Sequence, residues 1–256
     1  MLVTDAPSRA PSDAPPDALL DVPPQDWAAY TAEEHDVWAT LYRRRMGALA
    51  ATASAVYLGG ARAIGLDPDR VPDLADVNRR LEPRTGWAAV PVGGFLPAPA
   101  FFASLAARRF PTTTTVRPRA QLDYLEAPDI FHDVFGHVPL HADPQFAAFL
   151  QRFGAVAARA RRPEDVELMT RLFWFTVEFG LVREGGAVKV YGSGLVSSHA
   201  DAAHALGPDC ERRPFSLDAV AAQGFRVDRI QQVLFVVDDF AELFGGVEAA
   251  AGRVEG

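Results

Sequence analysis

The stretch FHDVFGHVPLH, residues 131–141, places three histidines within ten positions of a mostly apolar segment. Two of them, His132 and His137, lie five residues apart. On a regular α-helix, side chains five positions apart point about 140° away from each other, whereas those four apart differ by about 40°. Both imidazoles can therefore reach one ion only if the backbone departs from regular geometry or one residue lies at a helix end. Gly136 and Pro139 offer reasons for such a departure.

A second apolar segment, RLFWFTVEFGLV at residues 171–182, contains a single acidic residue, Glu178. No basic residue lies between Arg171 and Arg183 to pair with it locally. Burying a carboxylate is costly unless its charge is compensated, and a metal ion compensates it. Without a metal, the two histidines of the first segment would be ordinary core or capping residues. The acidic partner favours a metal site.

Three interpretations of these residues remain open. Two histidines and one carboxylate form a facial triad, which is typical of non-haem Fe(II) that activates O2. Alternatively, the protein is a zinc hydrolase that uses His132, His137 and either Glu178 or His141. This spacing differs from that of the zinc peptidase motif HExxH, whose histidines are four apart. A third interpretation is a binding module without catalysis, although three intact ligand positions speak against it.

Composition excludes several other classes of protein. The formal net charge is −8 with a pI of about 5.2, which disfavours nucleic acid as a partner, and the basic runs at 43–45 and 159–162 are interpreted as solvated helix faces. Mean hydropathy is close to zero, and no apolar run approaches the roughly 18–20 residues of a membrane helix. The N-terminus lacks the features of a signal peptide. Cys210 is the only cysteine, so we expect a cytoplasmic protein in a reducing compartment.

The pattern of elements predicts an α+β fold that is predominantly α-helical, with one domain over residues 26–256. Residues 1–25 are rich in Pro, Ala, Asp and Ser and are predicted to form a disordered tail. Helices are expected over 31–45, 46–64, 74–81, 101–109, 129–137, 145–160 and 164–180 and from Asp239 onward, a loop over 90–102, strands over 112–116 and 233–237, and a hairpin over 181–191.

Three stretches closely resemble the pterin-dependent aromatic amino acid hydroxylases: PDIFHDVFGHVPL (128–140), FWFTVEFGLV (173–182) and YGSGLVSS (191–198). They occur in the family's order and spacing, and the resemblance extends over roughly residues 26–245. It implies a catalytic domain with helices around an iron-containing cleft. It further implies a monooxygenase that uses Fe(II), tetrahydrobiopterin or another tetrahydropterin, and O2 to hydroxylate the ring of an aromatic amino acid.

The resemblance also assigns roles to particular residues. Arg117 would grip the substrate carboxylate, and Phe101 would stack on the pterin ring. Asp133 would contact the pterin through water, and Asp129 is a candidate acceptor for the N–H of a ligand imidazole. The iron ligands implied are His132, His137 and Glu178. The remaining implied contacts are Trp174, Phe179, Gly194, Ser197 and Ser198 for the amino acid, and Gly94 and Leu96 for the pterin.

Two departures from the family's pattern leave the substrate open. Ala127 stands where many relatives carry glutamate, and Leu125 stands where animal members carry threonine. We expect phenylalanine to be converted to tyrosine, with phenylalanine 3-hydroxylation or tryptophan hydroxylation as alternatives. The length resembles that of the short bacterial phenylalanine hydroxylases, so a monomer is expected, supported by a pterin dehydratase and reductase. A hydrolase triad of Ser193, His199 and Asp201 is disfavoured, since no G-x-S-x-G motif is present.

Overall fold

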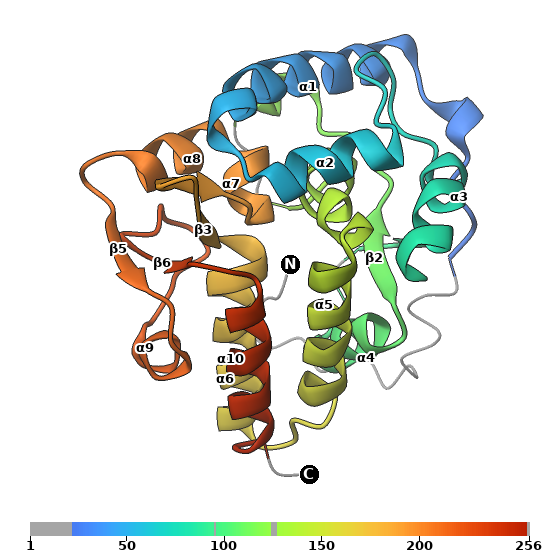
Figure 1. The fold of residues 1–256 in the computed structure, drawn as a ribbon. Coiled ribbons are helices and arrows are strands. Elements are labelled where there is room, and N and C mark those ends of the chain that lie inside the picture. Colours follow the sequence, from blue (N-terminus) through green and yellow to red (C-terminus); the bar gives the residue numbers. More distant parts are fainter. Residues whose placement is uncertain (1–21, 95, 124–126, 255–256) are drawn as a thin grey trace.

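The computed structural model describes residues 22–94, 96–123 and 127–254, and helices dominate it (Figure 1). The expected α+β fold with predominant helix is confirmed. The α-helices are α1 (Ala32–Thr52), α2 (Ala55–Ile64), α3 (Leu74–Thr85), α4 (Ala98–Ala106), α5 (Pro144–Ala157), α6 (Pro163–Phe173), α7 (Ser193–Ser197), α8 (His199–Leu206), α9 (Leu217–Ala222) and α10 (Ala241–Ala251). Short 3-10 helices are η2 (Trp27–Ala29), η3 (Arg119–Gln121) and η5 (Val138–Ala142). No helix in these three ranges is long and apolar enough to cross a membrane.

Two small sheets accompany the helices. The parallel strands β1 (Ala88–Val92) and β2 (Arg109–Thr113) form one sheet. The other has the strand order β4-β3-β6-β5 and consists of β3 (Leu181–Glu184), β4 (Ala187–Val190), β5 (Glu211–Pro214) and β6 (Val233–Val237). The expected hairpin is confirmed, because β3 and β4 pair antiparallel around Gly185 and Gly186. Both glycines have positive φ, 58° and 80°, which suits a tight hairpin turn.

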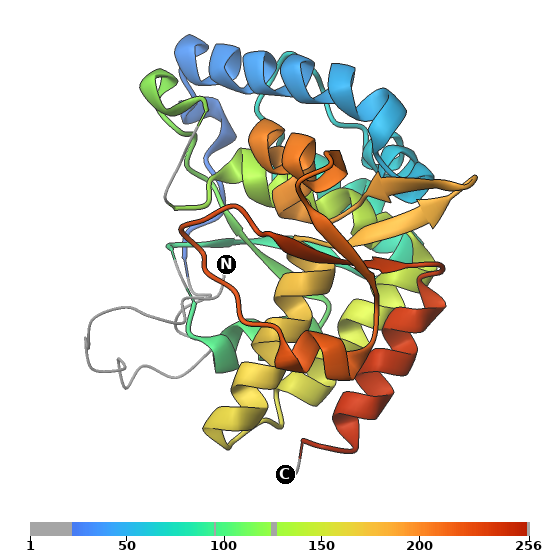
Figure 2. The same cartoon turned by 90° about the vertical axis from the view of Figure 1, so that its left-hand side faces the viewer.

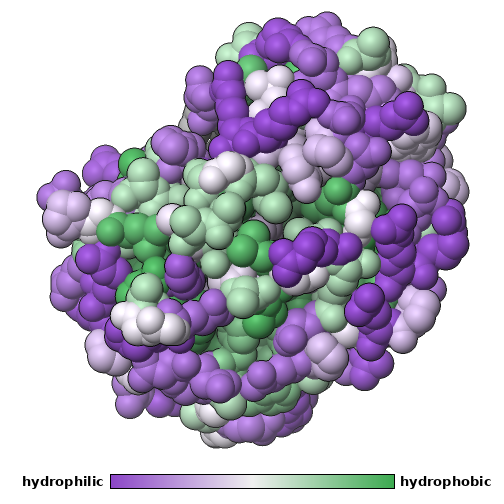
Figure 3. Space-filling view, turned by 45° about the horizontal axis from the view of Figure 1, so that its top comes forward, coloured by the Kyte–Doolittle hydropathy of each residue, from purple (hydrophilic) through white to green (hydrophobic). Residues whose placement is uncertain are grey.

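The long helices surround one continuous apolar core. In Figure 1, α1 and α2 cross one end of the molecule, while α5, α6 and α10 run side by side at the other. Figure 2 shows the four-stranded sheet between these two ends. Large aromatic side chains such as Phe146, Phe149 and Phe153 of α5 are fully buried in this core. On the face in Figure 3, apolar residues gather near the centre and hydrophilic ones border them.

The N-terminal half shows where local sequence signals succeed and fail. The Thr31 hydroxyl accepts from the backbone of Glu34, and the Glu34 carboxylate accepts from the backbone of Thr31, so the expected capping box opens α1. The expected boundary between residues 45 and 46 is wrong, because α1 continues to Thr52. The break comes at Ala53, after which Ser54 caps α2 through the N–H of Tyr57.

Other differences concern short elements. The helix expected from Phe101 begins at Ala98, and β2 begins at Arg109 rather than at residue 112. The strand β1 occupies part of the expected loop over 90–102. The elements α7, α8, β5 and α9 were not predicted, because each has eight residues or fewer and lacks a clear periodic pattern.

The boundary of the expected tail also shifts. Residues 1–21 lie outside the described part of the chain, so their predicted disorder is untested. Gln25, which was placed in that tail, is held by tertiary contacts. Its side-chain amide donates to the carbonyl of Pro72 at 3.0 Å and accepts from the N–H of Leu74 at 2.8 Å. The ordered part therefore begins before residue 26.

Candidate metal centre and active site

A π-helix, η4 (Phe131–His137), resolves the unusual spacing of the two histidines. In a π-helix the backbone hydrogen bonds run from i to i+5, so residues five apart lie closer to the same side than they do on an α-helix. The rings of His132 and His137 consequently face the same side, with centroids 5.1 Å apart. The expected departure from regular helix geometry is confirmed. π-helices are rare and are often found at functional sites.

A second π-helix, η6 (Trp174–Glu178), continues directly from α6 and ends at the predicted acidic ligand. The continuous helix expected over 164–180 is therefore wrong in its last turns. Glu178 Oε1 lies 3.4 Å from Nε2 of His132, and Glu178 Oε2 lies 3.2 Å from Nε2 of His137. The ligand atoms of the three residues all lie within 4.8 Å of one another. In the described part of the chain this is the one group of three or more His, Cys, Asp or Glu residues arranged so closely.

The electrostatics of this group fit a bound cation. Burial raises the pKa of the Glu178 carboxyl, but the neighbouring His132 and His137 outweigh this and hold the pKa well below its usual range. Burial lowers the pKa of His137, which keeps that imidazole neutral. Nε2 of His132 is buried and makes no hydrogen bond. An anionic carboxylate and two imidazole nitrogens thus point at one place, which is the donor set of a facial triad.

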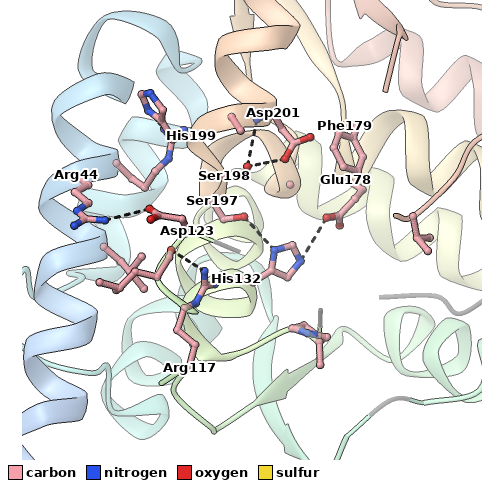
Figure 4. Close-up of a pocket in the computed structure, with 18 of the residues that line it drawn as sticks. Arg44, Arg117, Asp123, His132, Glu178, Phe179, Ser197, Ser198, His199 and Asp201 are labelled. Atoms are coloured by element: carbon pink, nitrogen blue, oxygen red, sulfur yellow. Dashed lines mark hydrogen bonds and ion pairs between the residues drawn. The ribbon is translucent and has the colours of Figure 1, made fainter. Parts of the chain in front are cut away.

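The tautomer of His132 follows from its neighbour Ser197. The hydroxyl of Ser197 donates to the carbonyl of Ser193 at 2.7 Å and lies 3.1 Å from Nδ1 of His132. Since a hydroxyl has one proton to donate, Nδ1 must carry the proton of the imidazole and donate it to Ser197. In the neutral ring the lone pair is then on Nε2, the atom that faces Glu178 (Figure 4). Such an outer contact orients a metal-binding histidine.

His141 lies outside the ligand group. Its Nδ1 is 2.9 Å from the carbonyl of His137, and its ring packs edge-on against Trp87 at a centroid distance of 4.6 Å. Burial, reinforced by the nearby His137, lowers the pKa of His141 to about 3, so the ring is neutral. The alternative ligand set with His141 as the third imidazole is therefore wrong. His141 contacts the backbone of His137, a candidate ligand.

Asp129 has different partners from the expected one. Its carboxylate accepts from Nε and Nη2 of Arg117 at 2.9 and 2.8 Å and from the backbone N–H of His132 at 3.0 Å. The expected hydrogen bond from a ligand imidazole is not formed. The Asp129 carboxylate accepts from Arg117 and from the backbone instead, and Nδ1 of His132 contacts Ser197. Burial opposes ionisation of Asp129, yet Arg117 holds its pKa below the usual value. The pair is almost completely buried.

All six residues expected at the amino acid site line one cavity of about 630 Å³. They are Arg117, Trp174, Phe179, Gly194, Ser197 and Ser198. The side chains of His132 and Glu178 open into the same cavity (Figure 4). The rings of Trp174 and Phe179 lie 4.8 Å apart and provide an apolar wall. Ala127, one of the two departures, lines the cavity as well, whereas Leu125 lies outside the described residues.

The four residues expected at the pterin site line a second, much smaller cavity. They are Gly94, Leu96, Phe101 and Asp133. Pro128 lines both cavities, so the two adjoin. The Asp133 carboxylate accepts from the N–H and the hydroxyl of Thr113, both at 2.7 Å. The Phe101 ring is buried and packs edge-on against Phe173 at 5.3 Å.

Two residues of the site were missed from the sequence. Arg45 was interpreted as part of a solvated basic run, but it is 3% exposed and donates to the carbonyls of Leu195 and Val196. Ser193 donates to Oε2 of Glu178 at 2.8 Å. The period of α1 places Arg45 on the same side as the buried Leu41 and Leu49, four residues away in each direction, and this signal could have identified it.

The hydrolase triad that was disfavoured from the sequence is also absent from the described residues. Ser193 contacts Glu178, while His199 Nδ1 contacts Arg45 at 3.4 Å. The Asp201 carboxylate accepts from Ser198 instead. Ser193, His199 and Asp201 therefore each contact a different residue and do not form a triad with one another.

Comparison with known proteins agrees with this geometry. The sequence model of the biopterin-dependent aromatic amino acid hydroxylases matches residues 24–253. The chain is 43% identical over 220 residues to a phenylalanine-4-hydroxylase of Caulobacter vibrioides, covering 86% of this chain and 75% of the relative. The structure of the Chromobacterium violaceum phenylalanine hydroxylase with Fe(III) superposes with a TM-score of 0.89 at 38% identity, over 93% of this chain and 87% of that one. A second structure, with iron(III) and 7,8-dihydrobiopterin, gives 0.88 at 39%, over the same shares of the two chains.

The chain belongs to the biopterin-dependent aromatic amino acid hydroxylase family. Within that family, its similarity to bacterial phenylalanine hydroxylases extends over most of both chains.

Proposed function

We propose that this protein is a phenylalanine 4-monooxygenase that uses Fe(II), a tetrahydropterin and O2. The observation that carries the proposal is the group of His132, His137 and Glu178, two of which, His132 and Glu178, line a cavity together with Trp174 and Phe179. Family membership and the relatives that bind iron and dihydrobiopterin support it. The proposal covers one catalytic domain over residues 26–256.

The metal would be held by His132, His137 and Glu178. Iron and reduced pterin together supply the reduction of O2, from which one oxygen atom enters the aromatic ring. The protein contributes binding, orientation and exclusion of water. Three protein ligands of this kind would leave room for further ligands on a bound Fe(II), and His132 and Glu178 line the large cavity.

The amino acid would lie in the large cavity, with its ring against Trp174 and Phe179. Arg117 would bind the substrate carboxylate. Its Nε and Nη2 already donate to Asp129, while Nη1 makes only a long contact of 3.5 Å to the carbonyl of Leu122. A guanidinium has five N–H donors, so the Nη1–Nη2 edge remains available for a second carboxylate. Asp129 thereby holds the arginine in position for the substrate.

The pterin would bind beside Pro128, where the two cavities adjoin. Phe101 would stack on its ring, the backbone of Gly94 and Leu96 would form hydrogen bonds, and Asp133 would make a contact through water. The fixed orientation of the Asp133 carboxylate, held by Thr113, supports this arrangement. Gly194, Ser197 and Ser198 would complete the amino acid site.

We also propose that the protein acts as a monomer in the cytoplasm, with a pterin dehydratase and reductase to regenerate the cofactor. Ferrous iron and tetrahydropterin both oxidise readily, so a reducing compartment suits them. The single cysteine is consistent with such a compartment.

One assay tests the proposed reaction. The protein is loaded anaerobically with Fe(II), mixed with tetrahydropterin and with Phe, Tyr or Trp, and then exposed to O2. We expect tyrosine from phenylalanine in amounts that match pterin oxidation. Formation of 3-hydroxyphenylalanine, or turnover of tryptophan above that of phenylalanine, would favour the alternatives within the family. Hydrolytic activity with Zn²⁺ and no hydroxylation would contradict the proposal.

A further inference from the structure

Ser193 has no role in the function proposed above, yet it contacts a proposed metal ligand. It is the first residue of α7 and is completely buried. Its hydroxyl donates to Oε2 of Glu178 at 2.8 Å, and the other acceptor within reach, the carbonyl of Val177, is at 3.5 Å. Among the described residues, Ser193 provides the one hydroxyl that donates to this carboxylate.

This hydrogen bond gains importance when a metal ion is bound. A ligand imidazole offers the lone pair of Nε2 to the ion and has no proton there to donate. The contact of His137 with Glu178 then no longer serves as a hydrogen bond. Ser193 remains as the donor that fixes one oxygen of the carboxylate and with it the direction of the other.

The hydroxyl of Ser193 is held in place by the packing of α7. Gly136 lies so close that a Cβ there would be 3.2 Å from Cβ of Ser193 and 3.1 Å from its carbonyl oxygen. At Gly194, a Cβ would come within 2.9 Å of Oε1 of Glu178. From the other side, Arg45 donates to the carbonyls of Leu195 and Val196 at 3.0 and 2.8 Å. The serine is therefore preorganised rather than free to rotate away with its helix.

We propose that Ser193 is a positioning residue that orients the Glu178 carboxylate for metal binding. The inference rests on the metal site of the proposed function. Removing an outer partner of a metal ligand typically lowers metal affinity about 10–100-fold. We expect an effect of this size from the loss of the Ser193 hydroxyl.

Metal affinity provides the test, with Co(II) as a spectroscopic probe. The dissociation constant of Co(II) is measured by competition with a chelator for the wild type, Ser193→Ala, Ser193→Cys and Ser104→Ala. Ser104 is a matched control, because its hydroxyl is also buried but makes no hydrogen bond. We expect a dissociation constant about 10–100-fold higher for Ser193→Ala, an intermediate value for Ser193→Cys, whose S–H is a weaker donor, and an unchanged value for Ser104→Ala. The visible spectrum of bound Co(II) should change in Ser193→Ala and stay as in the wild type in Ser104→Ala.

Circular dichroism of the metal-free proteins verifies that each variant is folded. A Co(II) affinity of Ser193→Ala within twofold of the wild type would overturn the proposal, and so would an equal loss in Ser104→Ala. If Ser193→Ala does not fold, Ser193→Cys decides, and wild-type affinity in that variant would overturn it. Glu178→Gln separates the role of Ser193 from the existence of the metal site, because unchanged Co(II) binding in this variant would refute the metal site itself.

Discussion

The metal centre and the outer rim of the amino acid cavity differ in how they are built. The centre consists of two buried residues, His137 and Glu178, and the partly buried His132, all on two π-helices and supported by contacts with α7. At the rim, Arg44 and Asp123 form an ion pair at 3.3 Å in which both side chains are largely exposed. Exposed pairs of this kind contribute little to stability. Packing and hydrogen bonds therefore hold the side chains of the centre in one arrangement, whereas residues of the rim can be substituted without loss of the fold.

This difference predicts where substitutions act. Changes at the centre should weaken metal binding most, changes at the substrate and pterin contacts should act mainly on the binding of that ligand, and a change at the buried His141 should act mainly on stability.

Glu178→Gln should have the largest effect. The amide keeps the shape of the side chain but removes the negative charge, which no imidazole can supply. We expect Fe(II) affinity and hydroxylation to fall by more than the roughly 100-fold that outer contacts can account for. Iron content after anaerobic reconstitution and product formation are the measurements. Wild-type iron content together with wild-type turnover would show that the ligand assignment is wrong.

Arg117→Ala should affect both substrate binding and stability. Loss of a charge-assisted hydrogen bond to the substrate carboxylate costs about 1.5–3 kcal/mol, so the KM for phenylalanine should rise roughly tenfold to hundredfold. The variant also leaves the buried Asp129 without its partner, which typically costs about 3–5 kcal/mol in the free energy of unfolding. Arg117→Lys keeps the charge but loses the planar fork and should lie between the wild type and Ala.

A substrate analogue without the carboxylate separates the two effects of Arg117. It should bind the wild type and Arg117→Ala about equally weakly, while iron content stays normal in folded protein. If both enzymes discriminate equally between phenylalanine and the analogue, Arg117 serves only to pair with Asp129.

Phe101→Ala should raise the KM for pterin about tenfold and leave the KM for phenylalanine nearly unchanged. Stacking of a planar ring on an aromatic side chain is worth about 1–3 kcal/mol. Steady-state kinetics with each substrate varied in turn measures the split. An unchanged KM for pterin would show that the pterin ring does not stack on Phe101 in the small cavity.

His141→Phe should have the smallest effect, seen mainly as a change in the pH dependence of stability. In the folded protein His141 stays neutral down to a pKa of about 3, whereas an unfolded histidine titrates near 6.5. Between these values the unfolded state binds a proton that the folded state does not, so this residue makes the protein less stable as pH falls below about 6.5.

Phenylalanine preserves the packing against Trp87 and removes the titration. Thermal unfolding of the metal-free protein at several pH values between 7 and 5 should show a shallower loss of stability in the variant. A slope identical to that of the wild type would assign the acid sensitivity to other groups.

The sequence identified the candidate ligands better than the backbone geometry that brings them together. His132, His137 and Glu178 could be found because few residue types bind a metal, and a carboxylate in an apolar segment needs a partner. The spacing of five excluded a regular helix between the two histidines, but it did not reveal the π-helix, because that geometry depends on tertiary packing.

Contacts between distant segments were the least predictable. Arg45 reaches Val196 across 151 positions, so no local pattern reveals its partner. Asp129 was assigned to an imidazole because both are near in sequence, yet Arg117 offers it two parallel donors and forms the stronger pair. Short elements such as β5, with the polar sequence ERRP, gave no periodic signal and became visible only when paired with β6.

Isotopically labelled O2 tests the central claim most directly. The Fe(II)-loaded protein is supplied with tetrahydropterin and phenylalanine under labelled O2, and tyrosine is analysed by mass spectrometry. The account predicts tyrosine carrying one labelled oxygen in the wild type and none from Glu178→Gln. Tyrosine that takes its oxygen from water, or no tyrosine from an iron-loaded and folded wild-type protein, would contradict it.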